Sequence, residues 1–107
     1  MKVIPKSAAR LFHEGDEECR EYVRTEKIAF GTSLLLPGQH GDMDLGHPHS
    51  HEVFFVVEGH IRLNTGDGKE TYELFAGDSI LIPMGVPHQL ANIGDTAAVI
   101  SWSMAPT

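Results

Sequence analysis

Three histidines stand on alternate positions near the middle of the chain, and a glutamate comes directly after them. They are His47, His49 and His51, followed by Glu52. On a β-strand, side chains two positions apart point to the same face and lie about 7 Å apart along it. Two such imidazoles can share one metal ion, since each nitrogen must come within about 2.0–2.1 Å of an ion such as zinc. The stretch 41–59 therefore indicates a metal site, and a histidine-rich surface turn is the alternative.

A second pattern, in residues 77–92, delivers another histidine. Pro83 ends a strand there because proline cannot donate to a β-ladder, and Gly85 permits a backbone reversal before His88. The fixed positions of the pattern G-x5-P-x-G-x2-H-x3-N are Gly77, Pro83, Gly85, His88 and Asn92. This spacing makes His88 a further candidate ligand, with a half-buried strand histidine as the alternative.

The elements that must position these histidines are short strands and turns. Strands are predicted over residues 21–25, 28–36, 53–58, 60–65, 69–74, 79–82, 87–92 and 96–104. Residues 1–20 are expected to be irregular, with one short helical turn near residues 7–12, and residues 38–46 are expected to form a loop. Short strands separated by turns this often predict an all-β sandwich or barrel.

Length, charge and cysteine content limit the number of domains, the possible partners and the cellular compartment. The 107 residues form one expected domain, 1–107, with a single hydrophobic core. A net charge of −7 argues against nucleic acid or an anionic membrane as the main partner. The lone cysteine, Cys19, cannot form an intramolecular disulfide, and its acidic neighbours would not lower its pKa, so we interpret it as structural. With no apolar leader or membrane-spanning stretch, a cytoplasmic protein is expected.

Together the two histidine patterns resemble the two motifs of the cupin superfamily. The first motif, G-x5-H-x-H-x3,4-E-x6-G, is met in residues 41–59 by Gly41, His47, His49, Glu52 and Gly59, and the second is met at every position of residues 77–92. The resemblance implies a cupin-type double-stranded β-helix, that is, an all-β conical jelly-roll barrel. It also implies a divalent transition metal (Fe, Mn, Ni or Zn) in the barrel mouth, with the ligands His47, His49, Glu52 and His88.

One spacing departs from the family pattern. Only two residues separate His49 from Glu52, one fewer than the usual minimum. On a regular strand Glu52 would face away from both motif histidines, so an irregularity such as a β-bulge is expected just before it. The alternatives are that His51 replaces Glu52 as a ligand, or that the ligand pair is His49 and His51. The apolar run Val53–Val57 favours Glu52, because a slip of one residue would turn the inward side chains of that strand outward.

A metal held in this way leaves coordination positions open for a chelating substrate and for O₂ or water. The expected function is therefore a small metal-dependent enzyme acting on a polar small molecule, either a dioxygenase or a non-redox isomerase, lyase or decarboxylase. The alternative is a metal-bearing binding or sensor module without catalysis, because one fold hosts many activities. Apolar residues on both faces of Val53–Val57 and an apolar tail containing Trp102 predict a homodimer.

Overall fold

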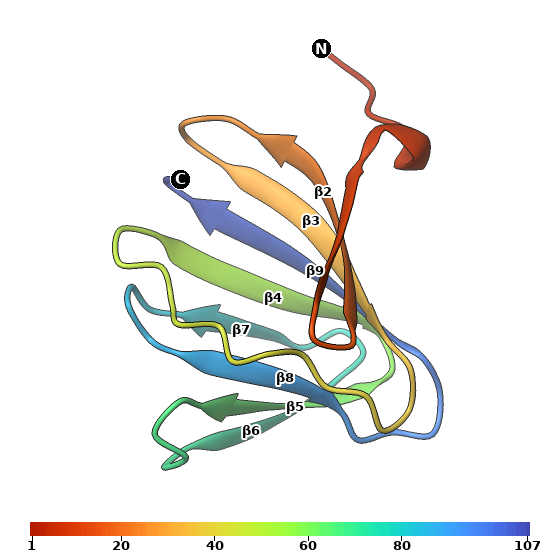
Figure 1. The fold of residues 1–107 in the computed structure, drawn as a ribbon, viewed down its shortest axis with the longest axis vertical. Coiled ribbons are helices and arrows are strands. Elements are labelled where there is room, and N and C mark those ends of the chain that lie inside the picture. Colours follow the sequence, from red (N-terminus) through yellow and green to blue (C-terminus); the bar gives the residue numbers. More distant parts are fainter.

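The computed structural model describes residues 1–107, and strands make up most of it (Figure 1). One 3-10 turn, η1 (Lys6–Ala8), precedes β1 (Arg10–Glu14), β2 (Glu17–Arg24), β3 (Ala29–Leu35), β4 (His51–Glu58), β5 (His60–Thr65), β6 (Thr71–Phe75), β7 (Ser79–Ile82), β8 (His88–Asn92) and β9 (Ala98–Ala105). The predicted all-β jelly-roll fold is confirmed. No helix has the length and apolar character needed to cross a membrane.

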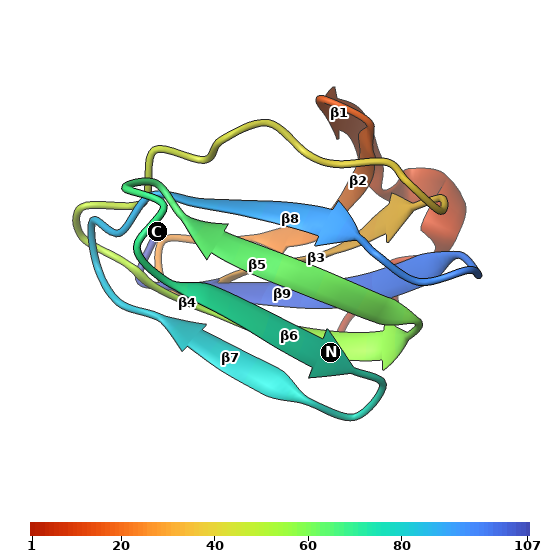
Figure 2. The same cartoon turned by 90° about the horizontal axis from the view of Figure 1, so that it is seen from below.

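The strands form two antiparallel sheets. The larger has the order β1-β2-β3-β9-β4-β7 and the smaller the order β6-β5-β8, and Figure 2 shows the smaller sheet lying across the larger one. Between them lies a core whose largest fully buried apolar side chains are Leu35, Val56, Ile61, Leu63 and Ile100.

Strand β4 divides its side chains between this core and the outer surface. Phe54 and Val56 are buried, whereas Val53, Phe55 and Val57 are 40%, 43% and 47% exposed. The alternation follows from the two-residue repeat of a strand. Because the exposed set is also apolar, the outer face of β4 presents hydrophobic surface that the chain itself does not cover.

The expectation of an irregular N-terminal segment is wrong beyond residue 9. Residues 10–24 form the β1–β2 hairpin, in which Arg10 pairs with Glu21 and Glu14 with Glu17. Gly15 makes the turn with φ 61°, a value that glycine adopts without a steric penalty. The sequence concealed this hairpin because its inward positions carry charged residues that line a cavity, so the usual alternation of apolar and polar residues is missing.

The loop between β3 and β4 runs beside β8 and brings Asp44 next to His88. Asp44 and His88 exchange backbone hydrogen bonds of 2.8 and 2.9 Å. Gly46, with φ 87°, passes so near the backbone that a Cβ there would lie 2.8 Å from the carbonyl carbon of Gly85. The predicted loop over residues 38–46 is confirmed, and its close packing fixes the position of Asp44.

Candidate metal centre

Four side chains from the β3–β4 loop, β4 and β8 converge at one end of the space between the sheets. They belong to Asp44, His47, Glu52 and His88. Glu52 Oε1 lies 3.1 Å from His88 Nε2, and Asp44 Oδ2 lies 3.5 Å from His47 Nε2. The distances from His47 Nε2 to Glu52 Oε1 and from His88 Nε2 to Asp44 Oδ2 are both 3.8 Å. Neighbouring atoms that bind one ion at about 2.0–2.2 Å are separated by roughly 3–3.5 Å, so this spacing fits a shared ion.

His88 turns one particular nitrogen toward the cluster. Its Nδ1 lies 2.9 Å from the carbonyl oxygen of Val86 and donates to it, which leaves a lone pair on Nε2 in the neutral ring. Nε2 and Glu52 Oε1 are both buried and have no hydrogen-bond donor. Two acceptors facing each other away from water are unfavourable unless a proton or a metal ion lies between them.

The pKa of His88 reflects this arrangement. Burial lowers it, but the Glu52 carboxylate, the Val86 carbonyl and the charge of Asp44 outweigh burial, so the net shift is upward. The metal-free cluster therefore favours a proton at the position that a metal ion would take.

Asp44 is a site residue that sequence reasoning missed. The backbone N–H of Gly46 donates to Asp44 Oδ1 at 2.8 Å, which leaves Oδ2 facing His47 and His88. Asp44 belongs to no motif position. The signal that could have found it is an acidic residue three positions before His47, in a loop that must approach the second motif.

The other two histidines of residues 41–59, His49 and His51, lie outside this cluster. His49 is exposed in a turn, and its ring makes none of the contacts that join the four side chains. His51, the first residue of β4, is exposed, whereas Glu52 is 6% exposed. The irregularity ahead of Glu52 is therefore a turn at Pro48–His49 and not a β-bulge, and the expected ligand His49 lies on that exposed turn.

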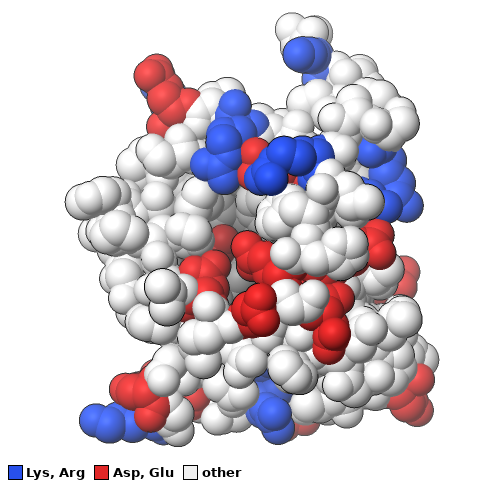
Figure 3. Space-filling view, in the orientation of Figure 1, with Lys and Arg blue, Asp and Glu red and all other residues white.

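An open cavity of about 160 Å³ leads to the cluster. This volume is below the range of about 300–1,000 Å³ typical of sites for drug-sized molecules, so the cavity suits a small ligand. Figure 3 shows the hollow, with carboxylates gathered on one side and guanidinium groups on the other. The latter belong to Arg10 and Arg24, which bind Glu21 at 3.2 Å and at 2.9 and 3.0 Å respectively. Hydrogen bonds from Arg24 chiefly hold the pKa of Glu21 below its usual value.

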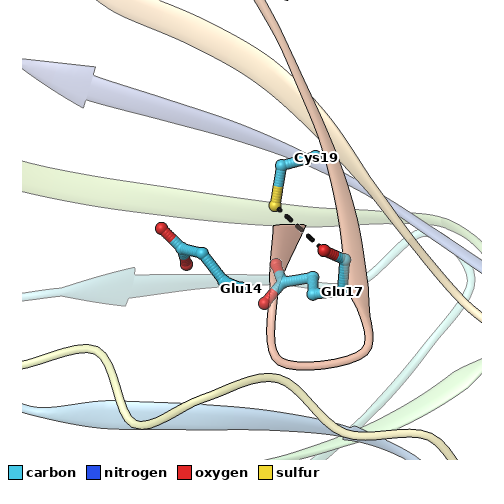
Figure 4. Close-up of side chains that lie close together, drawn as sticks. All are labelled: Glu14, Glu17 and Cys19. Atoms are coloured by element: carbon cyan, nitrogen blue, oxygen red, sulfur yellow. Dashed lines mark hydrogen bonds between the residues drawn. The ribbon is translucent and has the colours of Figure 1, made fainter. Parts of the chain in front are cut away.

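The hairpin contributes a second group of ionisable side chains to the same cavity. Glu14, Glu17 and Cys19 each have a polar atom within 4.8 Å of the other two (Figure 4). Burial, assisted by the charge of Glu17, raises the pKa of the Cys19 thiol to about 12. The prediction that nothing lowers the pKa of Cys19 agrees with this shift, and the residue is a buried thiol.

The model of the cupin domain family matches residues 31–104, which is most of the chain and includes the whole four-residue cluster. The chain belongs to the cupin family. In this cupin, β1 and β2 precede the matched region. The four side chains Asp44, His47, Glu52 and His88 thus lie within the matched cupin domain, and Glu14, Glu17 and Cys19 lie outside it.

Two curated relatives share part of this cupin. It is 33% identical over 76 residues to "Polyketide synthase CurC" of Streptomyces cyaneus, a match covering 71% of this chain and 47% of that protein. It is 49% identical over 43 residues to the uncharacterized protein YdbB of Bacillus subtilis (strain 168), covering 40% of this chain and 37% of that protein. The matches therefore span less than half the length of either relative.

Solved structures share its fold. A predicted oxalate decarboxylase from Thermotoga maritima superposes with a TM-score of 0.82 at 17% identity, covering 99% of this chain and 100% of that chain. The cupin domain of Schizosaccharomyces pombe Cnp3 gives a TM-score of 0.79 at 17% identity, covering 94% and 71% of the two chains. At such identities these likenesses show the cupin barrel and not an activity.

Proposed function

We propose that this cupin is a metal-dependent enzyme acting on a small polar molecule. The observation that supports this most directly is the pair Glu52 Oε1 and His88 Nε2, two buried acceptors 3.1 Å apart with no donor. A divalent cation satisfies both at once, and Asp44 and His47 offer further ligand atoms within 3.8 Å. The open cavity in front of the four side chains gives a small molecule access to them.

The ligands in this proposal are Asp44, His47, Glu52 and His88. Two imidazoles and two carboxylates are a donor set suited to Fe, Mn, Ni or Zn in the divalent state. When bound, such an ion polarises a substrate carbonyl or carboxylate oxygen. Compared with the sequence-based expectation, Asp44 takes the place of His49 in the proposed set.

The substrate proposed for this site carries carbonyl or carboxylate oxygens. Oxygen atoms suit a metal with open positions, and Phe54 and Trp102 supply apolar walls for a carbon skeleton. One curated relative carries a name that fits such a substrate, "Polyketide synthase CurC". Both a dioxygenase reaction and a non-redox isomerase, lyase or decarboxylase reaction are compatible with a four-ligand metal site.

Metal analysis tests the proposal. Protein purified without added metal, and protein dialysed against Zn²⁺ or Mn²⁺ and then against buffer, are expected to hold close to one ion per chain. His88→Ala should lose the ion because it removes a buried ligand, whereas His13→Ala, at an exposed position of β1, is the matched control. Equal metal content in wild type and His88→Ala would overturn the site.

We also propose a cytoplasmic homodimer. The exposed apolar residues Val53, Phe55 and Val57 of β4 lie next to Leu81 of β7, which is 57% exposed and pairs with Val53. A second copy of the chain would remove this apolar surface from water. The cytoplasmic setting is supported by Cys19, which is buried as a free thiol.

A further inference from the structure

We propose that Glu17 is the proton-transferring residue of this site, and that the reaction is a non-redox rearrangement in which a proton leaves or joins the carbon next to a carbonyl group. The inference rests on the proposed function, because it requires a carbonyl substrate in the cavity in front of the metal centre. It favours the isomerase or lyase branch of that proposal over the dioxygenase branch.

The position of Glu17 carries the inference. It opens β2, is 7% exposed, and lines the same cavity as the four side chains of the metal centre. The absence of a side chain at Gly41 makes room for this carboxyl group, because a Cβ at position 41 would lie only 2.4 Å from Glu17 Oε2. A buried carboxyl that lines an open cavity and is not one of the four proposed ligands has the placement expected of a general acid or base.

Backbone hydrogen bonds hold this part of the hairpin against the β3–β4 loop. The N–H of Asp16 donates to the carbonyl of His40 at 3.1 Å, and the N–H of Asp42 donates to the carbonyl of Glu14 at 3.2 Å. Both bonds are made by hairpin residues just before Glu17, Glu14 and Asp16. Glu17 and the loop that carries Asp44 are therefore positioned together, which proton transfer to a metal-bound molecule requires.

The surroundings of Glu17 allow it to both donate and accept a proton near neutral pH. The groups that face it are Ser33 of β3, Glu14 of β1, Cys19 of β2, Glu52 of β4 and Asp44 of the loop. Burial raises its pKa to about 7; a hydrogen bond from Ser33 opposes the shift, and the charges of Glu14, Glu52 and Asp44 add to it. A carboxyl that is half protonated at working pH is suited to general acid–base catalysis.

A second metal ion at Glu14, Glu17 and Cys19 is a poorer explanation of the same cluster. A cysteine ligates metals as the thiolate, but burial raises the pKa of the Cys19 thiol to about 12. Its Sγ lies 3.7 Å from the Glu17 carbonyl oxygen and 3.6 Å from Ser33 Oγ, contacts that suit a neutral thiol (Figure 4). The cluster thus favours protonated groups: burial raises the pKa of Glu14 as well as that of Glu17, and the pKa of Glu17 rises to about 7.

The step itself is balanced without an added oxidant or reductant. The Glu17 carboxylate forms an O–H bond with the proton of the carbon next to the carbonyl. The electron pair of the broken C–H bond forms the C=C bond of an enolate, and the carbonyl π pair moves to the oxygen. In D₂O the proton on Glu17 is replaced by a deuteron from the solvent, and delivery of that deuteron to the same carbon gives exchange. Delivery of the proton or deuteron to another carbon gives isomerisation.

Proton exchange of 2-oxobutyrate in D₂O tests this assignment. The Zn²⁺-loaded full chain is expected to accelerate the loss of the C3 proton signal in ¹H NMR beyond an equal concentration of free Zn²⁺. Glu17→Gln should remove about 10²–10⁴-fold of that acceleration while its Zn²⁺ content stays unchanged. Glu18→Gln is the matched control, because Glu18 neighbours Glu17 but binds Arg20 at 2.6 Å and does not line the cavity.

A titration of ¹³C-labelled glutamate carboxyls provides a readout independent of turnover. One carboxyl of the metal-free protein should titrate near pH 7 and be missing from the Glu17→Gln spectrum. Wild-type exchange no faster than with free Zn²⁺, equal exchange in wild type and Glu17→Gln, or no carboxyl titrating near pH 7 would each overturn the role of Glu17. A chain that shows this titration but binds no Zn²⁺ would instead overturn the proposed metal-dependent function.

Discussion

Glu52 Oε1 and His88 Nε2 face each other across 3.1 Å in a buried site, and neither atom has a hydrogen-bond donor. The two residues come from different sheets and from motifs that are separate in the sequence. A proton between the two atoms forms a charge-assisted hydrogen bond, and a divalent ion bound by both excludes that proton. The metal-free and metal-loaded proteins should therefore differ most clearly at this pair.

The proposed ligand set can be tested at the position where structure and motif differ. We expect Asp44→Asn to weaken metal binding by at least about 100-fold, since even changes outside the ligand shell cost 10–100-fold. His49→Ala, in an exposed turn, should leave affinity and stoichiometry unchanged. Isothermal titration with Zn²⁺ measures both. A large loss in His49→Ala with none in Asp44→Asn would restore the motif-based set.

Metal binding should weaken on acidification, beginning above the usual titration range of histidine. Ligation requires neutral imidazole, and although burial alone lowers the pKa of His88, contacts with Glu52 and Val86 raise it overall. Protons therefore compete with the metal at higher pH than at an ordinary histidine. Zn²⁺ affinity measured by competition with a chelator between pH 8 and 5.5 checks this, and an affinity independent of pH over that range contradicts it.

Glu17 should make the metal-free protein less stable as the pH rises. Its pKa is about 7 in the folded chain against an ordinary value of 4.5, so between these values the folded state binds a proton that the unfolded state has lost. The resulting stabilisation is complete below pH 4.5 and is lost as the pH rises through 7, by at most about 3 kcal/mol. Urea unfolding at pH 5 and 8 should show this decline in wild type and a smaller one in Glu17→Gln. Parallel pH profiles for the two proteins would contradict it.

Mutation of the exposed apolar face of β4 should change the oligomeric mass of the protein. Phe55→Glu places a charge in the middle of the exposed apolar patch, so we expect it to convert a homodimer into a monomer at micromolar concentration. Light scattering on a sizing column measures the mass of both proteins. Lys69→Glu, in the exposed β5–β6 turn, changes charge at a site away from this patch and should keep the wild-type mass. A monomeric wild type contradicts the prediction.

The family motifs were sufficient to predict the barrel, and they also located Glu52 on the inner face of β4. Turn residues such as Pro83 and Gly85 are local signals, so most strand positions could be read directly from the sequence. Asp44 could not, because its role depends on a loop docking beside β8, a contact between residues distant in the sequence. The β1–β2 hairpin was concealed for a related reason, since inward-facing glutamates contradict the hydrophobic pattern that identifies a strand.

Trp102 offers an optical signal for the cavity. It is the only tryptophan of the chain, it is 8% exposed, and it lines the same cavity as Glu17 and His88. A Cβ on Gly31 would lie 2.2 Å from its ring, so Gly31→Ala must displace the ring or the strand. We expect a loss of about 1–3 kcal/mol of stability and a shifted emission maximum. Unchanged emission and stability would show that the ring has room to move.

The β1–β2 hairpin lies outside the matched cupin region but supplies one wall of the cavity. Two separate segments of the chain therefore line one cavity. The barrel contributes Asp44, His47, Glu52 and His88, and the hairpin contributes Glu14 and Glu17. Because the two sets lie in different segments of the sequence, residues of one can be mutated while those of the other stay the same. A hairpin transplanted between barrels of this kind would carry its ionisable groups with it, so this segment can change the groups that line the cavity while the barrel residues stay the same.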